Sequence, residues 1–358
     1  MKTLTKIFSG LVLAALAVSC SDWTDTEPLK VKYETLESKN HGLYEAYMAS
    51  VRAYHATQHQ VLIAKFDNKA EAPSGRADHI NCLPDSVDYV ILKNADNLSD
   101  AMVSEMAENR QLKAIPTLMQ ISYNAFESEY KAMVAAEEEK AALDPTYTAP
   151  GDSLGRFVPW MEEKVSQALK VADKYGYDGV NIIYSGKNPL SLREEGKADL
   201  SARQEAFFGK AEEWMKAHQD KLVFFEGTPK YILAQTSVLE KAKYIIIPAL
   251  SCVSSYDLSY TVNQNISADV PSGKFIVGVT TISVTDPTDN RGKFNGTDEN
   301  GKSLTAITGA AYWTAVPESN YTKAGLCVDN AQVDYYNITK VYSNIGKAIS
   351  IMNPSPEK

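Results

Sequence analysis

The feature that most constrains the fold is a repeated alternation of short apolar segments with longer amphipathic ones. The apolar segments are hydrophobic throughout rather than at every second position, which is typical of parallel strands buried on both faces. The segments that we expect to form strands are 61–66, 87–92, 113–119, 179–184, 222–225, 244–250, 275–281 and 324–328. The clearest helical segments are 41–56, 124–142, 156–174, 201–219 and 338–352.

Eight strand–helix units in a chain of 358 residues predict an α/β fold, a single (β/α)8 TIM barrel. The alternative is a doubly wound open sheet, which usually carries a Gly-rich phosphate loop after an early strand, and this sequence has none. No Pro-, Gly- or Ser-rich linker divides the chain, so we expect residues 41–358 to form one monomeric barrel. The segment 286–301 is expected to be a long polar loop.

Residues 1–19 have the pattern of a signal peptide, with a basic start, an apolar run and small residues before Cys20. The run is too short to span a bilayer comfortably. The sequence "LAVSC" resembles a lipobox, so we expect Cys20 to be lipidated and residues 20–40 to begin the mature chain as a flexible tether. Ordinary secretion is the alternative. The acidic residues after Cys20 resemble the export signal of surface lipoproteins in Gram-negative bacteria, which predicts a location at the outer membrane, facing outward.

The net charge of −9 argues against a nucleic-acid partner, because phosphate binding needs a basic surface. Cys82, Cys252 and Cys327 cannot all pair and match no zinc pattern, so we expect buried free thiols. The pair His55 and His59 also matches no zinc helix motif. The sequence therefore predicts neither a metal nor a cofactor.

In a TIM barrel the functional site lies at the C-terminal ends of the strands. The residues that follow the predicted strands here are mainly amides, hydroxyls and a few carboxylates, which suit hydrogen bonding to sugar hydroxyls. Trp313 is expected to add a stacking wall from the loop region before the last strand. The candidate glycan-binding residues are Asp67, Gln120, Tyr184, Ser185, Glu226, Trp313, Asp329 and Asn330.

The stretch "YDGVNIIYS" at 177–185 resembles the fourth-strand signature of glycoside hydrolase family 18, the chitinases and endo-β-N-acetylglucosaminidases. Asp178 and Gly179 match the start of the signature, and Asn181 stands where Asp or Asn is accepted. Ile183 replaces the Asp that orients the substrate's acetamido group, and Ser185 replaces the catalytic Glu. The resemblance extends over roughly residues 57–354 and looks closest to lipoprotein members of glycan-uptake loci.

These two replacements remove the groups that the family's mechanism needs. A serine hydroxyl cannot protonate a leaving glycosidic oxygen, and isoleucine cannot orient an amide. The resemblance therefore implies a non-catalytic surface protein that captures oligosaccharides, such as N-glycans containing N-acetylglucosamine, for an outer-membrane transporter complex. One alternative is an active endo-β-N-acetylglucosaminidase-like hydrolase with relocated catalytic residues, in which Glu226 is the candidate acid. Another is a structural subunit of the uptake complex.

Overall fold

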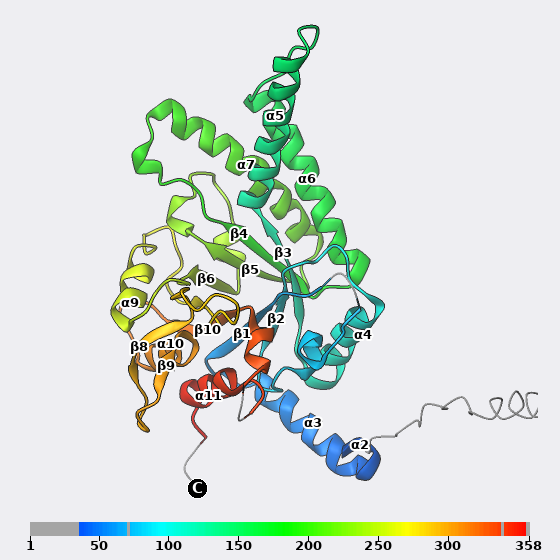
Figure 1. The fold of residues 1–358 in the computed structure, drawn as a ribbon, viewed down its shortest axis with the longest axis vertical. Coiled ribbons are helices and arrows are strands. Elements are labelled where there is room, and N and C mark those ends of the chain that lie inside the picture. The colour runs from blue at the N-terminus through cyan, green and yellow to red at the C-terminus, as the bar shows by residue number, and fades with distance from the viewer. Residues whose placement is uncertain (1–35, 70–71, 338–339, 356–358) are drawn as a thin grey trace, which may run out of the picture. The chain divides into compact units, whose positions relative to one another are not determined.

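A closed barrel of eight parallel strands forms the centre of the fold (Figure 1). The structure, a computed structural model, describes residues 36–69, 72–337 and 340–355. The strands follow the order β1-β10-β7-β6-β5-β4-β3-β2, and the ring closes where β1 pairs with β10. This closure confirms the predicted TIM barrel and excludes the open sheet. The barrel strands are β1 (Val61–Phe66), β2 (Tyr89–Leu92), β3 (Thr117–Ser122), β4 (Gly179–Tyr184), β5 (Leu222–Gly227), β6 (Tyr244–Pro248), β7 (Phe275–Thr280) and β10 (Lys323–Asp329).

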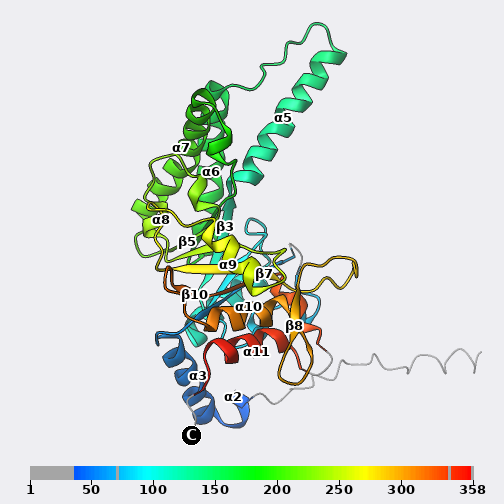
Figure 2. The same cartoon turned by 90° about the vertical axis from the view of Figure 1, so that its left-hand side faces the viewer.

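Helices connect successive strands, and α5, α6 and α7 extend well beyond the strand ends (Figure 2). The short helix α2 lies at the end of the segment 20–40 that the sequence predicts to be a flexible tether. The α-helices are α2 (Leu36–Lys39), α3 (His41–His55), α4 (Asp100–Glu108), α5 (Tyr123–Leu143), α6 (Leu154–Tyr175), α7 (Glu194–Ala217), α8 (Val238–Lys241), α9 (Ser255–Asn263), α10 (Ala306–Ala315) and α11 (Ser343–Met352). Shorter 3-10 and π turns are η1 (Arg76–Asp78), η2 (Ile80–Cys82), η3 (Asn109–Lys113), η4 (Pro189–Ser191), η5 (Pro229–Tyr231) and η6 (Ala331–Tyr335). Along the described ranges, no helix combines the length and the hydropathy that crossing a membrane requires.

The apolar core has two layers because successive strand residues point to opposite sides of the sheet. On β4, Val180, Ile182 and Tyr184 belong to the large cluster between the strands and the helices. The side chain of Asn181 points into the barrel, as its bond to a β5 carboxylate shows. The apolar residues that fill the barrel interior are Val61, Ile63, Tyr89, Ile91, Leu118, Phe224, Ile246, Ile276 and Cys327.

Two glycines allow β4 and β5 to approach closely. A Cβ at Gly179 would lie 2.2 Å from the carbonyl oxygen of Leu222. A Cβ at Gly227, where φ is +136°, would lie 1.7 Å from the carbonyl oxygen of Tyr184. No side chain fits at either position, so strand packing alone explains the glycine that follows Asp178.

The predicted polar loop at 286–301 instead contains part of a small antiparallel sheet, β8 (Lys293–Thr297) with β9 (Ser303–Thr305). Its anchor is Phe294, which is 9% exposed. The Phe294 ring lies where a Cβ on Gly309 of α10 would be, at 2.2 Å. A single apolar residue in a polar segment therefore holds this hairpin against the barrel.

Candidate functional site

Asp178 lies at the N-terminal end of β4, away from the C-terminal strand ends that we call the barrel mouth. One of its carboxylate oxygens accepts a hydrogen bond from the backbone N–H of Thr117 at 2.8 Å. The other accepts from Nε of Arg110. Asp178 thus joins the starts of β3 and β4, and its role here is structural.

A buried ion pair occupies the interior of the barrel below the mouth. Lys65 Nζ donates to both carboxylate oxygens of Glu226, each at 2.8 Å. Asn181 Nδ2 donates to Glu226 Oε2 at 2.6 Å. The side chains of Lys65 and Glu226 are only 9% and 12% exposed. Burial by itself lowers the pKa of Lys65, but the charge and hydrogen bond of Glu226, together with Cys327 and Asp329, raise it, and the net shift is upward.

This geometry makes Glu226 the counter-ion of a buried ammonium. Both of its oxygens accept hydrogen bonds from N–H donors, which is the environment of an ionised carboxylate. A general acid must instead carry the proton that it delivers. The chemistry available to Glu226 is therefore charge balance and hydrogen-bond acceptance.

The two positions where family 18 has its carboxylates provide none in this chain. Ile183 lies opposite Glu226 in the β4–β5 register. Ser185 is exposed, and the side chain of Asn124 holds its backbone on both sides. Ser185 N–H donates to Asn124 Oδ1 at 2.8 Å, and Asn124 Nδ2 donates to the Ser185 carbonyl at 2.9 Å. Ser185 is thus fixed at the end of its strand.

Ser185 borders a cavity of about 370 Å³ between the ends of β3 and β4 and helix α7. Charged side chains line much of it. Its lining residues are Tyr123, Asn124, Glu127, Lys131, Asp152, Ser185, Gly186, Lys187, Leu192, Gly196, Asp199, Leu200 and Arg203.

A second polar cavity, of about 280 Å³, lies over the ends of β1, β7 and β10. It brings together Asp67, Asp329 and Asn330, three of the residues proposed from the sequence. Lys93 Nζ lies 3.2 Å from Asp329 Oδ1 and donates to Asn330 Oδ1 at 3.0 Å. Asp67 also borders a more open depression of about 780 Å³. We call these two adjoining hollows the Asp67 cleft.

Gln120 lies on β3, and its side-chain nitrogen donates to the carbonyl of Lys93 at 3.3 Å. The oxygens Gln120 Oε1 and Asn181 Oδ1 are buried, and neither accepts a hydrogen bond from any described residue. Buried polar atoms normally have partners, so these two oxygens are unsatisfied acceptors inside the barrel.

The structure places two of the candidate glycan-binding residues, Tyr184 and Trp313, away from the barrel mouth. Tyr184 is completely buried between the barrel and its helices, where Gln204 Nε2 donates to its hydroxyl. Trp313 is 6% exposed and lies on α10, not in a loop. Its indole N–H donates to Ser259 Oγ at 2.9 Å, and Lys323 Nζ lies 4.0 Å from the ring centroid. Because Lys323 begins β10, Trp313 packs near the N-terminal end of that strand and cannot form a wall at the mouth.

Two cations at the barrel strands, Lys65 and Lys93, were not among the residues predicted from the sequence. A lysine inside the apolar run "VLIAKF" and another directly after "YVIL" were the available signals. Lysine is almost never fully buried unless it is paired, so each lysine indicated an acidic partner within the barrel.

Comparison with known families and structures agrees with the barrel fold. The model of the family described as "Glycoside hydrolase family 18, BT1044-like" matches residues 24–351. A glutamate-to-glutamine variant of BT1044 has a similar fold, with a TM-score of 0.59 and 16% identity over 90% of this chain and 96% of that one. The endo-beta-N-acetylglucosaminidase from Cordyceps militaris gives a TM-score of 0.55 and 15% identity over 86% of this chain and 96% of that one. The comparison with curated proteins found no match.

The family match covers the barrel and the degenerate signature on its fourth strand, and the two solved structures share the fold. The chain therefore belongs to glycoside hydrolase family 18, in its BT1044-like group.

Proposed function

We propose that this protein binds oligosaccharides at its barrel mouth and does not hydrolyse them by the mechanism of family 18. The proposal rests on two observations: the family's carboxylate positions hold no carboxylate, and Glu226 pairs with other side chains. Positions 183 and 185 hold Ile and Ser, and Glu226 accepts hydrogen bonds from Lys65 and Asn181. The polar Asp67 cleft supplies amides, carboxylates and hydroxyls suited to sugar recognition.

The relatives point to the class of ligand. One similar structure is named as an endo-beta-N-acetylglucosaminidase, so the ligand we propose is a glycan that contains N-acetylglucosamine, such as an N-glycan. Loss of two carboxylates near a neutral sugar also removes part of the desolvation cost of binding. Binding can therefore persist without turnover.

We also propose that lipidated Cys20, which lies outside the described residues, anchors the protein at the outer face of the outer membrane. There it would deliver captured oligosaccharide to a transporter complex. The support for this part is the lipobox-like sequence and the acidic residues after it.

A glycan array with the purified protein, followed by calorimetry on the glycan that binds, tests the proposal. We expect a Kd between about micromolar and millimolar, equivalent to roughly −8 to −4 kcal/mol. Asp67→Ala and Asn330→Ala should each weaken binding by about 1 kcal/mol or more. Asp220→Ala, an exposed change just before β5, is the control and should bind as the parent does.

Two outcomes would overturn the proposal. Release of free oligosaccharide from a chitobiose-core glycan, detected by mass spectrometry and abolished by Glu226→Gln, would show an active hydrolase with a relocated acid. Failure to bind any glycan on the array would favour a structural subunit with a vestigial site.

A further inference from the structure

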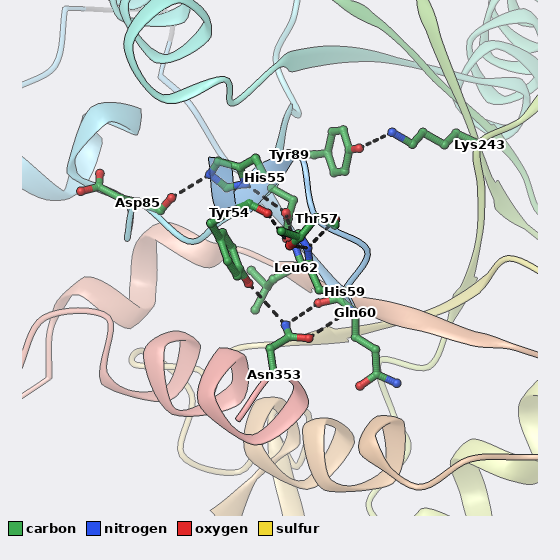
Figure 3. A network of polar contacts seen from close by, with 11 residues as sticks. Tyr54, His55, Thr57, His59, Gln60, Leu62, Asp85, Tyr89, Lys243 and Asn353 are labelled. Atoms are coloured by element: carbon green, nitrogen blue, oxygen red, sulfur yellow. Dashed lines mark hydrogen bonds and ion pairs between the residues drawn. The ribbon is translucent and has the colours of Figure 1, made fainter. Parts of the chain in front are cut away.

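Two imidazoles converge on one carboxylate, that of Asp88, at the N-terminal end of the barrel, opposite the mouth (Figure 3). His55 is the last residue of α3, His59 precedes β1, and Asp88 precedes β2. His55 Nδ1 lies 3.1 Å and His59 Nε2 2.7 Å from the same oxygen, Asp88 Oδ1. These side chains are only 5%, 8% and 5% exposed, respectively. The cluster is thus buried and takes no part in the site at the mouth.

The outer nitrogens of the two imidazoles determine where their protons lie. His55 Nε2 is 2.8 Å from the carbonyl oxygen of Asp85, and His59 Nδ1 is 2.9 Å from that of Thr57. A carbonyl oxygen can only accept, so each outer nitrogen carries its N–H. A neutral imidazole has a single N–H, which leaves a lone pair on each inner nitrogen. Two lone pairs then face an anionic oxygen, and this arrangement needs positive charge between them.

Either two added protons or one divalent metal ion can supply that charge. Imidazole nitrogen and carboxylate oxygen are ordinary zinc ligands, and histidines that bind a metal usually donate their other N–H to a carbonyl or carboxylate. Both imidazoles here already make that outer bond. We propose that His55, His59 and Asp88 bind a zinc ion, which joins the end of α3 to the starts of β1 and β2.

The potential ligand atoms already lie close together. The three potential ligand atoms lie within 4.8 Å of one another. Bonds of 2.0–2.1 Å to a tetrahedral zinc place ligand atoms about 3.3 Å apart, slightly wider than the contacts to Asp88 Oδ1. The backbone N–H of Leu62 donates to Asp88 Oδ2 at 2.8 Å, which orients the carboxylate and leaves Oδ1 for the ion. Water can fill the fourth position.

The test uses the full-length protein, stripped with EDTA, dialysed and titrated with ZnCl2. We expect one zinc per chain by mass spectrometry after dialysis, a saturable calorimetric signal, and a melting temperature that rises with zinc. Co²⁺ in place of Zn²⁺ should give the visible absorption of a tetrahedral site. His59→Gln should weaken zinc binding at least about 10-fold. His218→Gln, which changes a histidine stacked on Trp214, is the control and should bind zinc as the parent does.

His55→Gln provides a second variant, and circular dichroism without metal verifies that each variant is folded. The proposal is overturned if the parent retains no zinc after dialysis and melts at the same temperature with and without ZnCl2. Protons would then occupy the inner positions. Equal zinc binding by the parent, His55→Gln and His59→Gln would place the ion elsewhere and overturn it as well.

Discussion

Lys65 and Glu226 illustrate at the residue scale how a charge is kept inside an apolar barrel. Removal of one partner leaves the other charged, buried and unpaired, which typically costs about 3–5 kcal/mol. We therefore expect Lys65→Met to lower the free energy of unfolding by about that amount, measured by urea denaturation. The double variant Lys65→Met with Glu226→Gln should recover most of the loss, because no buried charge remains. If the double variant loses as much free energy of unfolding as the single variants Lys65→Met and Glu226→Gln lose when added together, the two side chains are not coupled as described.

Gly179 and Gly209 form a matched pair for testing the close approach of β4 and β5. Gly179→Ala forces a methyl group against the Leu222 carbonyl and should destabilise the protein by about 1–3 kcal/mol. Gly209 lies within α7 and, apart from its chain neighbours and the backbone of its own helix, no described atom lies within 4 Å of the added carbon. Gly209→Ala should therefore raise stability by about 0.5–1 kcal/mol. Thermal unfolding of both variants measures the difference in stability, and equal effects would contradict the close approach of β4 and β5.

At the residue scale, a strand that is apolar on both faces gives no sequence signal of which side chains face the barrel interior. The run around Tyr184 predicted a strand correctly, but no alternation showed which residues face the barrel and which face the helices. Tyr184 therefore looked available to a sugar. Trp313 was misplaced for a related reason: α10 is buried on nearly all sides, so its sequence lacks the amphipathic period that reveals a helix.

At the scale of elements, the β8–β9 hairpin depends on one aromatic anchor. Phe294→Ala removes the ring that packs on α10 and should cost about 3–5 kcal/mol, as for other buried phenylalanines. Val284 lies in the same connection and is 74% exposed, so Val284→Ala should change stability by no more than about 0.5 kcal/mol. Urea denaturation of the two variants gives the comparison. A small loss for Phe294→Ala would mean that the hairpin is not held by this contact.

The elements themselves were largely predictable, because eight apolar runs became eight strands with boundaries shifted by a few residues. The hairpin was missed because β8 and β9 are mostly polar and exposed, with only Phe294 buried. Strands of this kind form because they contact a helix elsewhere in the sequence, and their own composition gives little indication of that contact.

At the scale of the whole molecule, the expected anchor is chemically separate from the barrel. Cys20→Ala should shift the protein from the membrane to the soluble fraction, since lipidation depends on that thiol. Glycan binding and melting temperature should stay unchanged, because Cys20 lies outside the barrel strands. Fractionation and surface protease accessibility test this, with Cys252→Ala as a cysteine control that stays membrane-bound. Unchanged fractionation of Cys20→Ala would contradict the lipoprotein hypothesis.

The seam between β1 and β10 has a consequence for how the chain reaches its folded state. Val61 pairs with Gly325, so the first and last strands of the barrel must meet across nearly the whole sequence. A contact between residues so far apart in the sequence is costly to form, because it closes a very long loop. During synthesis, β1 and β7 present open edges until β10 becomes available, and unpaired edges invite association with other chains. A chain truncated before Lys323 keeps both edges permanently, so loss of the last strand should produce aggregates rather than a smaller folded protein.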